Sequence, residues 1–181
     1  SAYPSATLVA GEVTGAQASG DGFALALVGG ARLEGARLVL AFGIADVLPD
    51  LPGLAERWGT SVLHCPYCHG FEFAGRPLDV LHAGPLSAHQ AQLIAEWGPT
   101  TLFLNGSGPL DDDTSATLKE RGIRVEPAPV RALSGEGRAL SAVVLSDGRA
   151  VTLDALYVAP RTRLNSPIAG ELGCAVDEGP L

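Results

Sequence analysis

The chain has 181 residues, of which 46% are hydrophobic and 18% are charged, and its formal net charge is -8 at pH 7. This length allows one full core or two small ones, and the composition is ordinary for a globular protein. The 20 acidic side chains outnumber the 12 lysines and arginines, so there is no basic stripe for nucleic acid or for an anionic membrane surface. No apolar run is long enough to cross a bilayer.

The three cysteines are too few for a secreted disulfide scaffold. A cytoplasmic location is therefore expected. The first residue is Ser1, not Met, and a strand-like segment follows soon after it. We expect the chain to be an internal piece of a longer protein.

The N-terminal part of the chain predicts a β-meander. Residues 7–17, 22–30 and 31–42 are alternating or apolar runs, and glycine-rich turns separate them. Such runs indicate three antiparallel strands. Residues 43–53 contain two prolines in a short span, which predicts an irregular linker because proline removes a donor and restricts the residue before it.

After residue 59 the pattern changes to strands that alternate with helices. Apolar runs predict strands, and helical spacing that ends at a glycine predicts helices; the strands are expected at 61–64, 77–84, 100–106 and 123–130, and the helices at 86–98 and 111–122. This alternation is typical of a parallel sheet. Residues 131–160 contain two further turn signals and predict a β-excursion.

The expected fold class is therefore α/β: a Rossmann-like nucleotide-binding domain with a parallel sheet, helices and a β-meander, flanked by antiparallel strands of another domain. We place the first part of that other domain at residues 1–48. The nucleotide-binding-type domain is expected at 49–160, and residues 161–181 are expected to return to the first domain.

Residues 61–70 read SVLHCPYCHG and place Cys65 and Cys68 two residues apart, with a histidine on either side. A structural zinc site needs four thiolate or imidazole ligands. The remaining cysteine, Cys174, is far from the other two in the sequence, and the spacing of the histidines indicates no second pair of ligands. We expect no metal site. Residues 65–69 also match the C-x-x-C-H pattern of covalent haem attachment, which needs a second axial ligand in a chain that has no Met.

Two more interpretations of the pair stay open. CPYC is also the redox tetrad of glutaredoxins, but here a predicted meander precedes it and the downstream prolines do not follow Thr or Val. The cysteines can also be two small buried core residues. A pair bracketed by Pro, Tyr and two histidines is, however, not a typical apolar core run.

The chemistry of the stretch favours a dithiol–disulfide centre. Two intervening residues allow a small ring that opens and closes with little backbone movement. If Cys68 lies at a helix N-terminus, exposed N–H groups would favour its thiolate and lower its pKa. His69 is placed to carry the proton that each half-reaction moves. We therefore predict Cys65, Cys68 and His69 as catalytic residues.

Two segments carry a family resemblance: ARLVLAFGIADVLPDLPGL at residues 36–54 and WGTSVLHCPYCHGFEFAGRPLDVL at residues 58–81. Together they resemble the central part of thioredoxin reductase-like flavoproteins, which are FAD/NAD(P)-dependent pyridine nucleotide-disulfide oxidoreductases. The resemblance runs through essentially the whole chain. It implies that the first segment ends the strands of the FAD domain and crosses into the nicotinamide-nucleotide domain, which carries the C-x-x-C. The C-x-x-C-H-G variant resembles the dithiol oxidases of this class.

The resemblance also implies roles for single residues. Cys68 matches the cysteine that faces the flavin, and Cys65 matches the interchange thiol that reacts with the substrate. His69 stands where the bacterial reductases have an aspartate that acts as acid and base. FAD is the expected cofactor of the full-length protein, and Phe42 and Gly43, in the stretch that replaces the family's A-T-G run, are candidate flavin contacts.

The nucleotide-binding pattern of the reductases is mostly missing. The family has G-x-G-x-x-A after the strand, where glycines let the pyrophosphate approach a helix N-terminus. Residues 82–87 read HAGPLS here, so Gly84 is the glycine that remains as a candidate cofactor contact, and Pro85 lacks an N–H. Asp111 and its two acidic neighbours stand near the place where the family has a basic cluster for the 2′-phosphate of NADP, and they favour a solvated helix cap instead.

We therefore expect a flavin-dependent thiol–disulfide oxidoreductase that passes electrons between FAD and a dithiol or disulfide through Cys65 and Cys68, without ordinary NADPH use. The alternatives are an NADPH-dependent thioredoxin or disulfide reductase and a non-enzymatic redox-sensing module. The expected partner is a small-molecule or thioredoxin-like dithiol or disulfide, and no nucleic acid or membrane. The full-length protein is expected to be a homodimer, and the isolated chain to be inactive.

Overall fold

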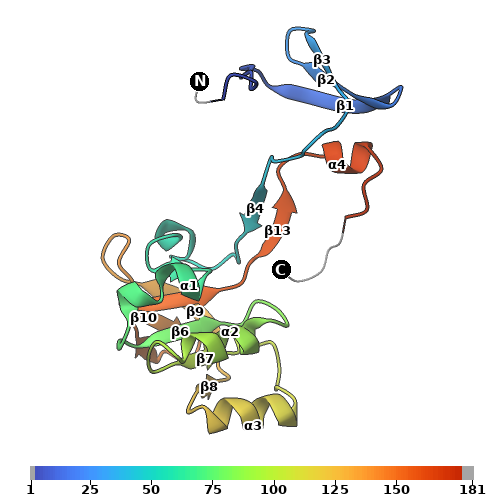
Figure 1. Cartoon of the computed structure of the whole chain (residues 1–181). Coiled ribbons are helices and arrows are strands. Elements are labelled where there is room, and N and C mark those ends of the chain that lie inside the picture. Colours follow the sequence, from blue (N-terminus) through green and yellow to red (C-terminus); the bar gives the residue numbers. More distant parts are fainter. Residues whose placement is uncertain (1–2, 177–181) are drawn as a thin grey trace. The chain divides into compact units, whose positions relative to one another are not determined.

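The computed structural model describes residues 3–176, which fall into two units (Figure 1). One unit comprises residues 3–45 and 163–176, and the other comprises residues 46–162. The assignment of the first unit to an FAD domain and of the second to a nucleotide-type domain, with limits at 48 and 160, stays a prediction. The end of the expected return segment, residues 177–181, lies outside the described residues.

The smaller unit contains the predicted meander. Its three antiparallel strands lie in the order β1-β2-β3, and their bounds are β1 Val13–Ser19, β2 Gly22–Leu27 and β3 Arg32–Gly35. Gly20 adopts a φ of 57° in the turn between β1 and β2, a conformation that glycine reaches without steric cost. A short helix, α4 (Ile168–Glu171), contacts β1. The predicted meander is therefore confirmed, although its third strand ends at Gly35.

The linker is more regular than the sequence predicts. Residues 44–47 form strand β4 (Ile44–Val47), which pairs with β13 (Arg161–Leu164) in a two-stranded sheet. The prediction of an irregular segment over 43–53 is wrong for these residues. Both prolines follow β4 in the sequence, so neither removes a backbone donor from it.

The larger unit is built on a five-stranded parallel sheet with the strand order β5-β12-β6-β7-β8. The bounds of its strands are β5 Val62–Leu63, β6 Leu78–Leu81, β7 Thr101–Phe103, β8 Arg124–Glu126 and β12 Ala155–Val158. The expected α/β fold with a parallel sheet is confirmed. The last strand of the predicted β-excursion, β12, lies in this sheet between β5 and β6.

Helices and a second sheet cover the parallel sheet. The helical segments are η1 Ala55–Arg57, α1 Pro66–His69, η2 Phe71–Phe73, α2 Ser87–Ile94 and α3 Asp112–Glu120. The antiparallel sheet consists of β9 Val130–Ser134, β10 Ala142–Leu145 and β11 Ala150–Thr152. Helix α3 begins at the predicted acidic cap, because the Asp111 side chain accepts a hydrogen bond of 2.8 Å from the Thr114 N–H, and the bonds from Thr114 lower the pKa of Asp111.

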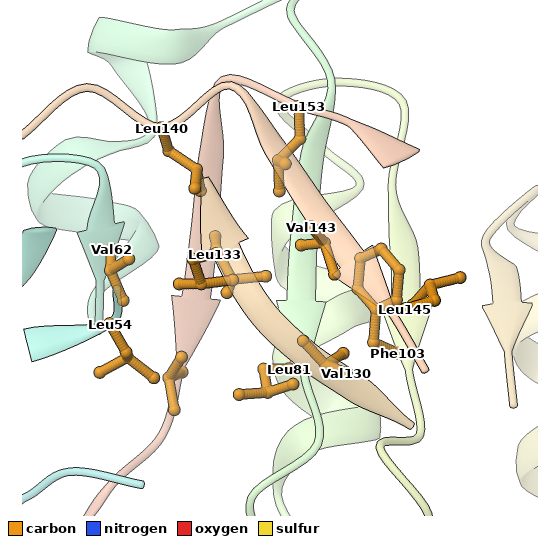
Figure 2. Packing of buried hydrophobic residues seen from close by; sticks show 12 residues of the cluster. Leu54, Val62, Leu81, Phe103, Val130, Leu133, Leu140, Val143, Leu145 and Leu153 are labelled. Atoms are coloured by element: carbon orange, nitrogen blue, oxygen red, sulfur yellow. The ribbon is translucent and has the colours of Figure 1, made fainter. Parts of the chain in front are cut away.

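The two faces of the parallel sheet belong to two hydrophobic clusters, because successive side chains of a strand point to opposite faces. One cluster joins the sheet to β9 and β10, and Figure 2 shows how Val62, Leu81 and Phe103 lie close to residues of those two strands. The other, which we call the helix-side cluster, joins the sheet to α2 and α3. Its buried members are Leu63, Leu78, Val80, Ala91, Ile94, Leu102, Leu104, Leu118, Ile123, Ala155 and Tyr157. No helix in the described part of the chain is long and apolar enough to span a bilayer.

Candidate active site at the paired cysteines

The two cysteines lie on a single helical turn that directly follows β5. Cys65 is extended, with a φ of -100° and a ψ of 116°, and is the N-cap of α1. Pro66 occupies the first helical position, where its missing N–H removes no hydrogen bond. The His69 N–H donates to the Cys65 carbonyl over 3.3 Å. One helical turn therefore brings Cys68 back above Cys65.

The sulfur atoms of the pair are in contact. Cys68 Sγ donates a hydrogen bond to Cys65 Sγ over 2.8 Å, and both residues are free thiols. Cys68 is exposed and Cys65 is half-buried. The hydrogen bond to Cys65, then burial, then the charge of Cys65 raise the pKa of Cys68. The condition for a lowered pKa of Cys68 is not met, since Cys65 and not Cys68 is the N-cap of α1.

His69 lies at the end of the same turn, beside a carboxylate. Its Nδ1 is 3.3 Å from Glu72 Oε2, and 38% of the His69 side chain is exposed. This contact engages Nδ1, and within the described residues no protein group hydrogen-bonds to Nε2. The catalytic role of His69 stays a prediction.

The dithiol turn packs closely onto the helix-side cluster at Gly70. A Cβ atom added to Gly70 would lie 2.5 Å from the Pro66 carbonyl oxygen and 2.6 Å from the Trp97 ring. Trp97 in turn packs against the helix-side cluster. Because Gly70 has an ordinary helical φ of -62°, close approach and not backbone conformation is the reason for glycine at this position.

The turn after β6, where a nucleotide would bind in a reductase, is closed by its own serine. Ser87 Oγ accepts hydrogen bonds from the N–H groups of Ala83, over 3.0 Å, and Gly84, over 3.3 Å, and Ser87 is fully buried. Pro85 has no N–H. A Cβ atom on Gly84 would meet nothing within 4 Å, so the turn has room for a ligand, but several of its donors are occupied or missing. A nicotinamide nucleotide fits these residues poorly.

Two further polar residues lie in this region. Burial lowers the pKa of His82, which precedes the turn. After β7, the Asn105 side chain accepts a hydrogen bond of 2.9 Å from the Val130 N–H. This side chain thus connects two chain segments in the region where the family has its 2′-phosphate cluster.

The two candidate flavin contacts lie in the smaller unit. The Phe42 carbonyl accepts a hydrogen bond of 3.1 Å from the Asn165 side chain, and the Gly43 carbonyl accepts one of 3.2 Å from the Asn165 N–H. Gly43 has a φ of 70°, and the nearest atom to a Cβ placed there is 3.7 Å away. The flavin contacts of Phe42 and Gly43 stay predictions.

The sequence did not indicate the polar side chains around Cys65. Gln90 of α2 donates through Nε2 to the His64 carbonyl over 2.8 Å, and it is 7% exposed. Tyr157 of β12 is fully buried, and its hydroxyl has no hydrogen-bond partner. The one available signal was a glutamine on the otherwise apolar face of a predicted helix.

Metal binding has no support from side-chain clusters. Within residues 3–176, no group of three or more His, Cys, Asp and Glu side chains gathers as a metal site would. The zinc alternative therefore has no ligand set in this part of the chain.

No family model matches the chain. A curated protein named thioredoxin reductase tcpT, from Claviceps purpurea, is 33% identical over 171 residues, which are 88% of this chain and 52% of that protein. Among solved structures, an oxidoreductase from Agrobacterium tumefaciens has a TM-score of 0.85 and 43% identity, and the match covers 95% of this chain and 57% of the other. The chain is thioredoxin reductase-like.

A second solved structure supports the same conclusion. The protein HlmI has a TM-score of 0.86 and 35% identity to this chain, with 96% of this chain and 56% of HlmI covered. A second curated relative, thioredoxin reductase sirT from Leptosphaeria maculans, is 30% identical over 164 residues. The thioredoxin reductase-like chain spans about half the length of the curated relatives it matches, 52% and 48% in these two cases. The predicted resemblance is confirmed.

Proposed function

We propose that the chain supplies the redox-active pair of a flavin-dependent thiol–disulfide oxidoreductase. In this proposal Cys65 and Cys68 alternate between dithiol and disulfide, and they pass electrons between FAD and a small-molecule or thioredoxin-like substrate. One observation carries the proposal: the two sulfur atoms lie 2.8 Å apart on an accessible turn. Bound FAD, for which Phe42 and Gly43 offer an open turn, would supply the acceptor or donor of two electrons.

The chain's own residues account for oxidation of a dithiol. One substrate thiolate attacks Cys65 Sγ of the disulfide, the Cys65–Cys68 bond breaks, and Cys68 leaves as a thiolate. The second substrate thiolate then attacks the substrate sulfur of the mixed disulfide and releases Cys65. The substrate has lost two electrons and two protons, and the cysteine pair has gained the two electrons. His69, held by Glu72, is the nearby group that accepts and returns a proton.

The closed turn after β6 supports a reaction without ordinary NADPH use. Phosphate groups bind at such turns through free backbone N–H groups, but two of these groups donate to Ser87. The names of the curated relatives favour a second candidate function, an NADPH-dependent disulfide reductase. We further propose a homodimer for the longer protein, which sedimentation analysis would test.

Anaerobic spectroscopy distinguishes the two functions. In a flavin-loaded protein that contains this chain, we expect dithiothreitol to bleach the visible flavin absorbance and NADPH to leave it unchanged. The Cys65→Ser variant is the control, and it should bleach with neither reagent. Rapid bleaching by NADPH at micromolar concentration would establish the reductase instead. Bound flavin that neither reagent bleaches would contradict both functions and favour a redox-sensing module.

A further inference from the structure

Three buried side-chain atoms in residues 3–176 have no hydrogen-bond partner: Asp79 Oδ2, Gln90 Oε1 and the Tyr157 hydroxyl. A buried polar group without a partner costs about 1–3 kcal/mol, so each such group needs an explanation. Gln90 and Tyr157 both contact the short segment that leads into Cys65. Buried hydrogen-bonding capacity therefore gathers next to a cysteine of the pair.

Tyr157 lies beside the short strand that leads into Cys65. In the parallel register of β12 and β5, Tyr157 is opposite Leu63, and both side chains belong to the helix-side cluster. Cys65 comes two residues after Leu63 and its backbone is still extended. The strand itself ends at Leu63, since His64 forms a bend, so Tyr157 lies beside the segment that leads directly into Cys65.

Two contacts hold the dithiol turn against the helix-side cluster. Gly70, at the end of α1, approaches the Trp97 ring so closely that a Cβ would lie 2.6 Å from it, and Trp97 packs on the cluster that contains Tyr157. Gln90 fixes the backbone just before Cys65 through its 2.8 Å bond to the His64 carbonyl.

The electrostatics agree with this placement. Burial, then the charges of Glu72 and Cys65, raise the pKa of Tyr157 to about 12. The hydroxyl therefore keeps its proton at neutral pH and lies within electrostatic range of Cys65. It is a buried donor without an acceptor while the cysteines are in their present arrangement.

We propose that Tyr157 is a positioning residue whose hydroxyl donates a hydrogen bond to the Cys65 sulfur when this sulfur is a thiolate. A thiolate is a strong acceptor, and hydrogen bonds to charged groups are about twice as strong as neutral ones. The bond forms when Cys65 of the reduced pair is a thiolate and cannot form to that thiolate once the disulfide has closed, so it makes the pair easier to reduce. The proposal rests on the cycling of Cys65 and Cys68 between dithiol and disulfide.

The first test is the redox equilibrium of the whole chain with glutathione. Two glutathione thiols reduce the Cys65–Cys68 disulfide, which leaves two cysteine thiols and one glutathione disulfide. We expect Tyr157→Phe to shift this equilibrium about tenfold toward the protein disulfide, which corresponds to about 30 mV. The matched control is Tyr67→Phe, which removes an exposed hydroxyl beside the same cysteines and should change nothing. Equal equilibrium constants for wild type and Tyr157→Phe would overturn the proposal.

The second test does not need a disulfide. In a background with Cys68→Ser and Cys174→Ser, iodoacetamide alkylates Cys65 through its thiolate. We expect Tyr157→Phe to slow this reaction several-fold at neutral pH, while Tyr67→Phe leaves the rate unchanged. If the wild-type chain forms no reversible disulfide, the proposed function fails and the alkylation rates still decide the role of Tyr157. Tyr157→Phe removes a buried group without a partner, so it should unfold at no lower urea concentration than wild type.

Discussion

Two turns that follow strands β5 and β6 of the same parallel sheet differ in their chemistry. The turn after β5 carries two thiols in contact, one of them exposed. At the turn after β6, two backbone N–H groups, those of Ala83 and Gly84, donate to Ser87. Both lie at the carboxyl ends of parallel strands, where α/β proteins bind ligands. A position at the carboxyl end of a parallel strand therefore makes a site possible. Whether the site can bind or react depends on its free groups, which are two thiols at the first turn, whereas two N–H groups at the second turn are already bonded.

The largest expected effect concerns the cysteines themselves. Cys65→Ser or Cys68→Ser should abolish reversible disulfide formation, because each removes one of two sulfur atoms that lie 2.8 Å apart. Thiol titration after mild oxidation and after reduction measures this. Cys174→Ser is the matched control and should retain the full change in thiol number. A disulfide that survives in Cys65→Ser would show that Cys68 reacts with another cysteine. The turn after β5 would then not carry a redox pair of its own.

The next prediction concerns Asp79 on β6, whose buried carboxylate should lower the stability of the fold at neutral pH. Burial raises the pKa of Asp79 to about 6, above its value in an unfolded chain. Between about pH 4 and pH 6 the unfolded chain has lost this proton while the folded chain keeps it, so the free energy of unfolding falls as pH rises through this window. The full cost, about 3 kcal/mol for a shift of about two pKa units, is present above pH 6.

Asp79→Asn should therefore unfold at higher urea than wild type at pH 8 and at a similar concentration near pH 4. The amide oxygen can still accept the hydrogen bond of 2.7 Å that the Thr101 N–H donates to the carboxylate. A variant that is less stable than wild type at pH 8 would contradict the cost assigned to the buried carboxylate.

Glycine at the two turns gives the next comparison. Gly70→Ala should lower the free energy of unfolding by about 1–3 kcal/mol, the usual range for overpacking, because its Cβ would clash with the Pro66 carbonyl and Trp97. Gly84→Ala is the matched change at the other turn, where a Cβ has open space. Its effect should stay within about 0.5 kcal/mol. Urea unfolding measures both variants, and equal losses would refute the difference in packing.

The last comparison concerns the serine that closes the second turn. Ser87→Ala removes the acceptor of two backbone N–H groups, and we expect it to lower the free energy of unfolding by about 2 kcal/mol, since the net value of a typical hydrogen bond is about 1 kcal/mol. Ser107→Ala, at an exposed position, is the control and should be neutral. A Ser87→Ala variant as stable as wild type would mean that the bonds from Ala83 and Gly84 contribute nothing to stability.

Local patterns in the sequence were enough for the main elements of the fold. Apolar runs located β6 and β7, and the acidic residues before α3 and Gly122 after it marked the limits of that helix. The place of β12 between β5 and β6 could not be predicted, since it depends on pairing between distant segments. Strand β4 was missed because the prolines after it were given too much weight.

The candidate site was predictable at the level of the pair and not at the level of its surroundings. The C-x-x-C spacing and the flanking segments indicated the two thiols. The position of Cys68 inside the helix was available from Pro66, which favours the first helical position, but this signal was not used. The hydroxyl groups of Ser87 and Tyr157 take their roles from neighbours on other strands and helices, and no local pattern reveals such contacts.

The pairing of β5 has a consequence for synthesis of the chain. In the five-stranded sheet β5 lies at the edge, and its neighbour is β12, so Val62 pairs with Leu156. On the ribosome, the segment with Cys65 and Cys68 emerges long before the strand that it must join. Until then the thiols are attached to an unpaired strand, open to oxidants and to other nascent chains. Pairing of β5 with β12 therefore completes the sheet beside these sulfur atoms only after most of the chain has been made.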